Sequence, residues 1–133
     1  MVNQETNTKL TNELTELIKK RCETVEEILY TERELFRYAK DIAEQELTVK
    51  IQLEKEISEA DQATLKTKYS NAEKRRLALE KALSSDEKLY TLKKRELEVK
   101  QDLHILATTD RINKIKERFL FKQVDLLLGG HKE

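Results

Sequence analysis

Apolar residues recur along the first half of the chain at alternating steps of three and four positions. This spacing places the side chains on one side of an α-helix, and over several heptads it predicts packing against another helix. We therefore predict a first helical arm over residues 8–57. Its apolar stripe contains Leu10, Leu14, Leu17, Ile28, Leu35, Tyr38, Ile42 and Val49.

A second apolar stripe lies one residue further along the same arm. Two adjacent stripes make a face wider than the seam of a two-stranded coiled coil, so we expect this arm to meet more than one neighbouring helix. Cys22 is interpreted as a small buried side chain of this face. The second stripe contains Ile18, Cys22, Val25, Leu29, Phe36, Ala39 and Ala43.

A second helical arm is predicted over residues 61–107. Ser58 can cap a new helix, which favours a chain reversal at residues 58–61. Ser84 and Glu87 have the spacing of a capping box, so residues 84–86 are the alternative site for the bend. The stripe of this arm contains Leu65, Tyr69, Ala72, Leu79, Leu83, Leu89, Leu92, Val99, Leu103 and Leu106.

The cluster Thr108, Thr109 and Asp110 resembles a helix N-cap, and Gly129 with Gly130 resembles a helix C-terminus. We therefore predict a short third helix over residues 111–128. Residues 1–7 and 129–133 are predicted to be tails around a single domain over residues 8–128. The expected fold class is all-α: an elongated antiparallel helical hairpin or coiled coil with a third C-terminal helix, assembled into an oligomeric helical bundle.

The composition agrees with long helices. Of 133 residues, 39% are charged, Pro is absent and there are only two Gly, a balance typical of coiled coils and helical bundles. The single cysteine excludes an internal disulfide and fits a reducing compartment. No secretory leader or membrane-spanning run is visible, so we expect a cytoplasmic protein.

Charge is divided unevenly between the two halves. Residues 1–60 hold 9 basic and 14 acidic residues, whereas residues 61–133 hold 17 basic and 12 acidic residues. This complementarity favours pairing of the halves, within one chain or between chains. We expect protein partners and a homo-oligomer, with a dimer favoured.

The residues that catalysis or metal binding would need are scarce. The chain has two histidines and one cysteine, without the spacings of zinc or calcium motifs, and it has no glycine-rich phosphate loop. We therefore predict no enzymatic activity, no cofactor and no metal site.

Two groups of residues are candidate contact sites. The segment over residues 111–122 is basic and carries apolar residues at helical spacing, so it can pack on the hairpin, contact phosphates or meet a membrane surface, which we consider the least favoured. Candidate contacts with a nucleic acid or a partner are Arg75, Arg76, Arg111, Lys114, Lys116, Arg118, Phe119 and Lys122. The candidate oligomer interface contains Leu14, Ile18, Val25, Leu29, Phe36, Val124, Leu127 and Leu128.

Asn71 and Arg75 are one helical turn apart, as are Asp86 and Tyr90, so each pair could share a partner and fix the alignment of two helices, or could only be solvated at the surface. Over residues 69–120 this tract resembles small uncharacterised coiled-coil proteins encoded in phage and mobile-element recombination or replication regions. The resemblance implies an accessory protein of a mobile element and transfers no activity or site residue.

These observations predict a non-catalytic coiled-coil scaffold or adaptor that binds another protein or self-assembles. One alternative is a nucleic-acid accessory factor that uses the basic C-terminal helix. The other is a stalk or export chaperone, because the charged hairpin, almost free of glycine, also resembles the small coiled-coil stalk proteins of flagellar and type III export systems.

Overall fold

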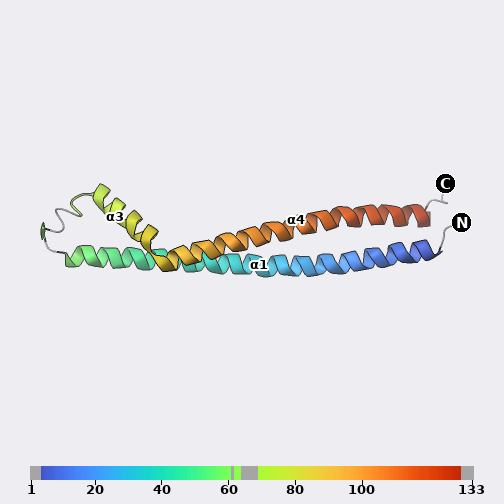
Figure 1. Cartoon of the computed structure of the whole chain (residues 1–133), viewed down its shortest axis with the longest axis horizontal. Coiled ribbons are helices and arrows are strands. Elements are labelled where there is room, and N and C mark those ends of the chain that lie inside the picture. The colour runs from blue at the N-terminus through green and yellow to red at the C-terminus, as the bar shows by residue number, and fades with distance from the viewer. Residues whose placement is uncertain (1–3, 61, 64–68, 130–133) are drawn as a thin grey trace. The chain divides into compact units, whose positions relative to one another are not determined.

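A computed structural model describes residues 4–60, 62–63 and 69–129 of the chain. Its helices are α1 (Gln4–Glu59), α3 (Ala72–Ser85) and α4 (Glu87–Gly129), shown in Figure 1. No β-strand occurs within these described ranges. The prediction of an all-α fold is confirmed.

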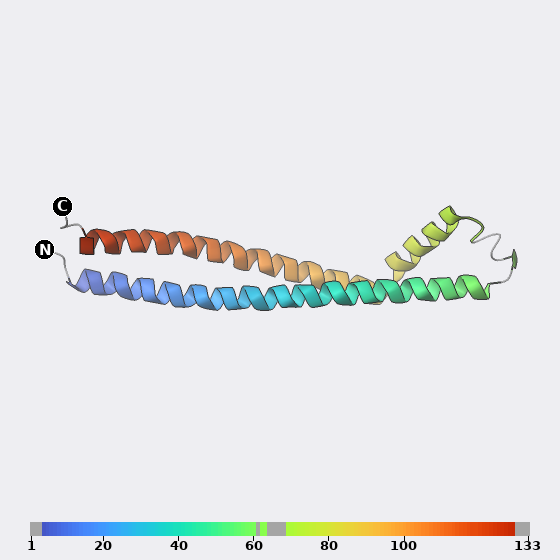
Figure 2. The ribbon, with the colours of Figure 1, turned by 180° about the vertical axis from the view of Figure 1, so that it is seen from behind.

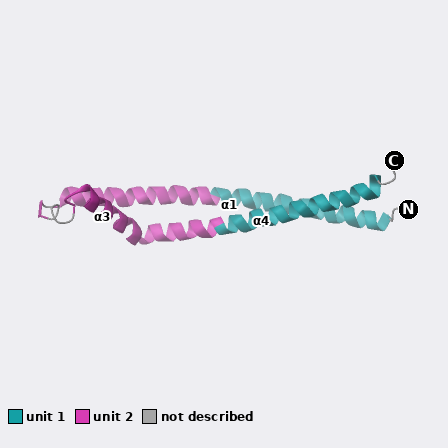
Figure 3. Cartoon of the chain, turned by 90° about the horizontal axis from the view of Figure 1, so that it is seen from above, with its two compact units in different colours: residues 1–33, 101–133 teal, residues 34–100 magenta. Residues whose placement is uncertain are grey.

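The chain divides into two compact units, coloured separately in Figure 3. Unit 1 comprises residues 1–33 and 101–133, and unit 2 comprises residues 34–100. Helices α1 and α4 each contribute to both units.

In unit 1, the first part of α1 lies antiparallel to the last part of α4. Leu17 lines one groove with Ile115 and Phe119, whereas Tyr30 lines another with Ile105. Residue numbers therefore rise along α1 while they fall along α4. Figures 1 and 2, seen from opposite sides, both show the blue start of α1 beside the red end of α4.

The residues that face between the two helices of unit 1 follow the predicted spacing of three and four. Leu14 is 8% exposed, and the other members of this seam are half-buried or buried. The low exposure of the predicted α1 stripe confirms that it faces inward. The seam of unit 1 contains Asn7, Leu10, Leu14, Leu17, Arg21, Thr24, Ile28 and Thr31 on α1, and Leu103, Leu106, Asp110, Asn113, Glu117, Leu120, Val124 and Leu127 on α4.

Unit 2 buries a small set of apolar residues from α1, the beginning of α4 and the segment before α3. Leu89 is 1% exposed, and Ile42, Leu53 and Tyr69 are each 9% exposed. Gln45 and Glu46 of α1 reach Asp86 and Lys93, respectively. The α1 positions predicted in this unit, Leu35, Tyr38 and Val49, are half-buried, as expected for an inward-facing stripe.

The end of α1 at Glu59 agrees with the predicted bend at residues 58–61, although Asp61 and Leu65 lie outside the described residues. The prediction of one arm starting at residue 61 is wrong, because residues 69–71 are not helical. Asn71 is the N-cap of α3, and its side chain accepts a hydrogen bond from the Lys74 backbone N–H at 2.9 Å.

A second break separates α3 from α4 at Asp86, where the sequence predicts a restart. Asp86 adopts an extended backbone conformation, and its Oδ2 accepts hydrogen bonds from the Leu89 backbone N–H at 2.9 Å and from Gln45 Nε2 at 3.0 Å. The cap is therefore Asp86 rather than Ser84, whose hydroxyl donates to the Lys81 carbonyl. Tyr90 is 68% exposed and does not share a partner with Asp86.

Two predicted helix starts are wrong. Helix α1 begins at Gln4 instead of residue 8, and α4 continues through Thr108, Thr109 and Asp110, so there is no separate third helix. Asp110 lies in the middle of α4, where its carboxylate binds Arg21 of α1. The predicted C-terminal end is confirmed at Gly129, while Gly130 lies outside the described residues.

The double role of Asp86 predicts a measurable loss of stability. Asp86→Ala should lower the free energy of unfolding by about 1 kcal/mol, because α4 loses its cap and Gln45 loses an acceptor. Asp86→Asn should lose clearly less, since an amide oxygen also caps helices. Urea unfolding measures both variants, and equal losses would contradict the capping role.

Candidate interaction surfaces

A layer of polar residues interrupts the apolar seam of unit 1. On α1, Arg21 and Thr24 occupy two successive seam positions between Leu17 and Ile28. On α4, the polar seam residues Asp110, Asn113 and Glu117 lie between Leu106 and Leu120. We call the five residues Arg21, Thr24, Asp110, Asn113 and Glu117 the polar layer.

Arg21 is the cation at the centre of this layer. Its Nη1 donates to Glu117 and its Nε donates to Asp110 at 3.4 Å, so one guanidinium joins two positions two turns apart on α4. The hydrogen bond with Glu117 is the main reason that the pKa of Arg21 is raised above its ordinary value, and Asp110 adds to it. The three side chains are about one-fifth to one-quarter exposed.

The two remaining polar residues of the layer are the most buried. Thr24 and Asn113 are 8% and 7% exposed. The Thr24 hydroxyl donates to the Lys20 carbonyl at 3.0 Å, so its polarity is satisfied within α1. A polar layer of this kind contributes little net stability, but it disfavours any shifted pairing that would leave a charge facing leucines.

The second predicted stripe of α1 is exposed. Within unit 1, its members are the α1 patch: Ile18, Cys22, Val25 and Leu29. Ile18, Val25 and Leu29 are 40%, 42% and 50% exposed. The prediction that Cys22 is buried is wrong for the single chain, because its free thiol is exposed.

The predicted oligomer interface therefore changes in composition. Leu14 is excluded because it is buried in the chain's own seam, and Val124 and Leu127 are half-buried on the same seam. Leu128 is 61% exposed. Phe36, which belongs to unit 2, is 78% exposed.

The predicted basic contacts fall into two groups. In unit 2, Arg76 binds Glu73 and Glu80, and the Glu73 hydrogen bond is the main cause of its raised pKa. Arg75 donates from Nε to the Tyr69 carbonyl at 3.2 Å, so it does not share a partner with Asn71. Both arginines are thus engaged within their own unit.

In unit 1, the basic residues of α4 remain accessible. Arg111, Lys114, Arg118 and Lys122, which we call the basic face, follow one another by three, four and four positions and are all exposed. Lys116 is exposed on another side of α4, and Phe119 is 62% exposed. The spacing of the basic face places its four charges along one side of α4.

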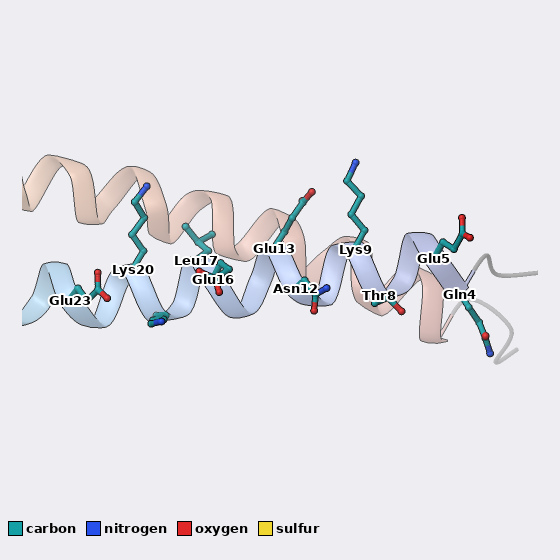
Figure 4. A pocket seen from close by; sticks show the side chains of 11 residues that line it. Gln4, Glu5, Thr8, Lys9, Asn12, Glu13, Glu16, Leu17, Lys20 and Glu23 are labelled. Carbon is teal, nitrogen blue, oxygen red and sulfur yellow. The ribbon is translucent and has the colours of Figure 1, made fainter.

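One surface groove is lined only by α1 residues between Gln4 and Glu23, and Figure 4 shows Lys9 and Lys20 pointing to one side of the helix while Gln4 and Thr8 point to the other. Among the described residues, no group of three or more His, Cys, Asp or Glu side chains could hold a metal ion.

No family model, curated protein or solved structure matches this chain. Within the described part of the chain, no helix combines the length and the apolarity that crossing a membrane would require.

The polar layer predicts a strong energetic coupling between Arg21 and Glu117. Arg21→Met should destabilise the chain, because Asp110 and Glu117 lose their shared cation. When Glu117→Gln is already present, the same substitution should cost clearly less. A double-mutant cycle in urea measures this coupling, with Lys20→Met as the control. Additive effects of the two substitutions would contradict the pairing.

Proposed function

We propose that this protein is a non-catalytic coiled-coil scaffold or adaptor that works by binding protein, including further copies of itself. The observation that carries the proposal is the α1 patch. Its apolar side chains are spaced for helix packing, and within unit 1 the neighbouring side of α1 already packs on α4.

Leaving this apolar row in water costs free energy, because burial of apolar surface is favourable. Scattered exposed apolar residues are normal, but a row of them at heptad spacing is the arrangement that another helix buries. The exposed area is apolar and narrow, which suits a helix better than a flat partner. The long helices supply the rigid support that such a surface needs.

A nucleic-acid accessory function is the second candidate, and the basic face supports it. Arg111, Lys114, Arg118 and Lys122 point along one side of α4 and are exposed, with Phe119 close to them in sequence. Four phosphate contacts give a modest attraction that salt weakens strongly. The α1 patch is more specific evidence, since a charged exposed face is common on helices.

The scaffold function predicts that polar substitutions in the α1 patch abolish association. Wild-type protein should show a light-scattering mass near twice the 15.7 kDa of one chain at tens of micromolar, and Val25→Glu should show the mass of one chain. The circular dichroism of the variant should remain helical, because residue 25 does not lie in the seam. Tyr30→Glu, at a position 66% exposed outside the patch, is the matched control. A single-chain mass for the wild type would remove self-assembly from the proposal.

The second candidate predicts salt-dependent binding of labelled DNA. If the basic face contacts phosphates, the logarithm of the binding constant should fall with the logarithm of salt concentration with a slope of roughly −3 to −4. Arg111→Glu with Arg118→Glu should abolish binding, whereas Arg76→Glu should not. A chain that binds neither single-stranded nor double-stranded DNA at low salt would rule this function out.

A further inference from the structure

The α1 patch has the same spacing when it is read in either direction. Ile18, Cys22, Val25 and Leu29 are separated by four, three and four residues, so the centre of the pattern lies between Glu23 and Thr24. A row with this spacing matches itself after a two-fold rotation, just as it does in a parallel pair. Two antiparallel copies can therefore align all four positions at once.

We propose that the α1 patch binds a second copy of this chain in antiparallel orientation, centred between residues 23 and 24. This inference rests on the proposed scaffold function and names its partner. In this arrangement Ile18 packs against Leu29 of the second copy, and Cys22 packs against Val25 of the second copy. The two-fold axis repeats both contacts, which makes four apolar layers.

The charges beside the patch favour the same arrangement. Lys19 and Glu26 directly follow Ile18 and Val25, both are exposed, and neither forms an ion pair with another described residue. In an antiparallel pair of helices, the positions that directly follow these apolar residues on one helix lie beside the same kind of position on the other helix. Lys19 of each copy therefore faces Glu26 of the other, and both pairs are attractive.

A parallel pair would also align the four apolar positions, but it would lose the pairing of Lys19 with Glu26. It would place Cys22 against Cys22 of the second copy, and Ile18 against Ile18. In a parallel pair, Lys19 would lie at the same level as Lys19 of the second copy. Glu26 of the second copy would then be seven residues further along the helix. The opposite charges at residues 19 and 26 thus select the antiparallel alignment, because side chains at these flanks set partner orientation in coiled coils.

Charge exchange tests the alignment without changing the apolar patch. Lys19→Glu or Glu26→Lys alone turns both attractive pairs into repulsive ones and should weaken the dimer roughly tenfold. A mixture of these two single variants should form heterodimers, because every pair across the interface is again attractive. Lys20→Glu, one residue away and off the patch, is the control and should leave the dimer unchanged. Equal dimer constants for all variants and their mixture would overturn the proposal.

Cross-linking tests the contact between residues 22 and 25 directly. Wild-type chains mixed with chains that carry both Cys22→Ser and Val25→Cys should form a disulfide-linked heterodimer rapidly with oxidised glutathione, because residue 22 of one chain meets residue 25 of the other. Each of these two proteins alone should cross-link much more slowly. Rapid cross-linking of the wild type would show a parallel pair and contradict the inference.

These results separate the two levels of the proposal. A wild-type dimer in light scattering, with no response to charge exchange and no residue 22 to residue 25 cross-link, would leave self-association intact and overturn the antiparallel patch. A wild-type chain that stays monomeric at tens of micromolar would overturn both the second copy as occupant and the self-assembly arm of the proposed function.

Discussion

The contact of Arg21 with Asp110 and Glu117 is the constraint on which unit 1 depends. A guanidinium facing another helix is tolerated only where carboxylates lie opposite, since a charge that loses water without gaining a partner is costly. The leucine layers on either side could pack after a shift of one heptad, but the polar layer could not. When Arg21 and Thr24 face α4, the positions that follow them, Cys22 and Val25, are turned by about 100° around α1 and lie exposed beside the seam.

The spacing of apolar residues was enough to predict the helical class and the inward stripe of α1. Leu14 and Ile42 are buried as predicted because a heptad pattern is a local property of the sequence. The helix ends at Glu59 and Gly129 were also close to their predicted positions. The restart at Asp86 was predicted at the correct place, with the wrong side chain as its cap.

The errors arose where one residue type can serve two purposes. An Asp after two Thr residues is typical of a helix N-cap, yet Asp110 lies inside α4, where it binds Arg21, 89 residues away. Cys22 was predicted to be buried because its stripe is apolar, but α4 covers only one of the two α1 stripes. In both cases the outcome depends on which distant segment packs against the residue, and a local sequence pattern does not give that information.

The sequence predicts that the acidic first half and the basic second half attract one another, but the ion pairs between the halves mostly do not follow their net charges. Among the described residues, Arg21 of the acidic half binds carboxylates of the basic half, which is the reverse of the net charges. Only Lys93 with Glu46 follows the expected direction between the halves. The side chains of the basic face of α4 do not pair with described residues of α1 and are exposed to solvent. An exposed apolar patch on α1 and an exposed basic face on α4 are surfaces that packing within unit 1 leaves accessible, and the proposal of a binding function rests on them.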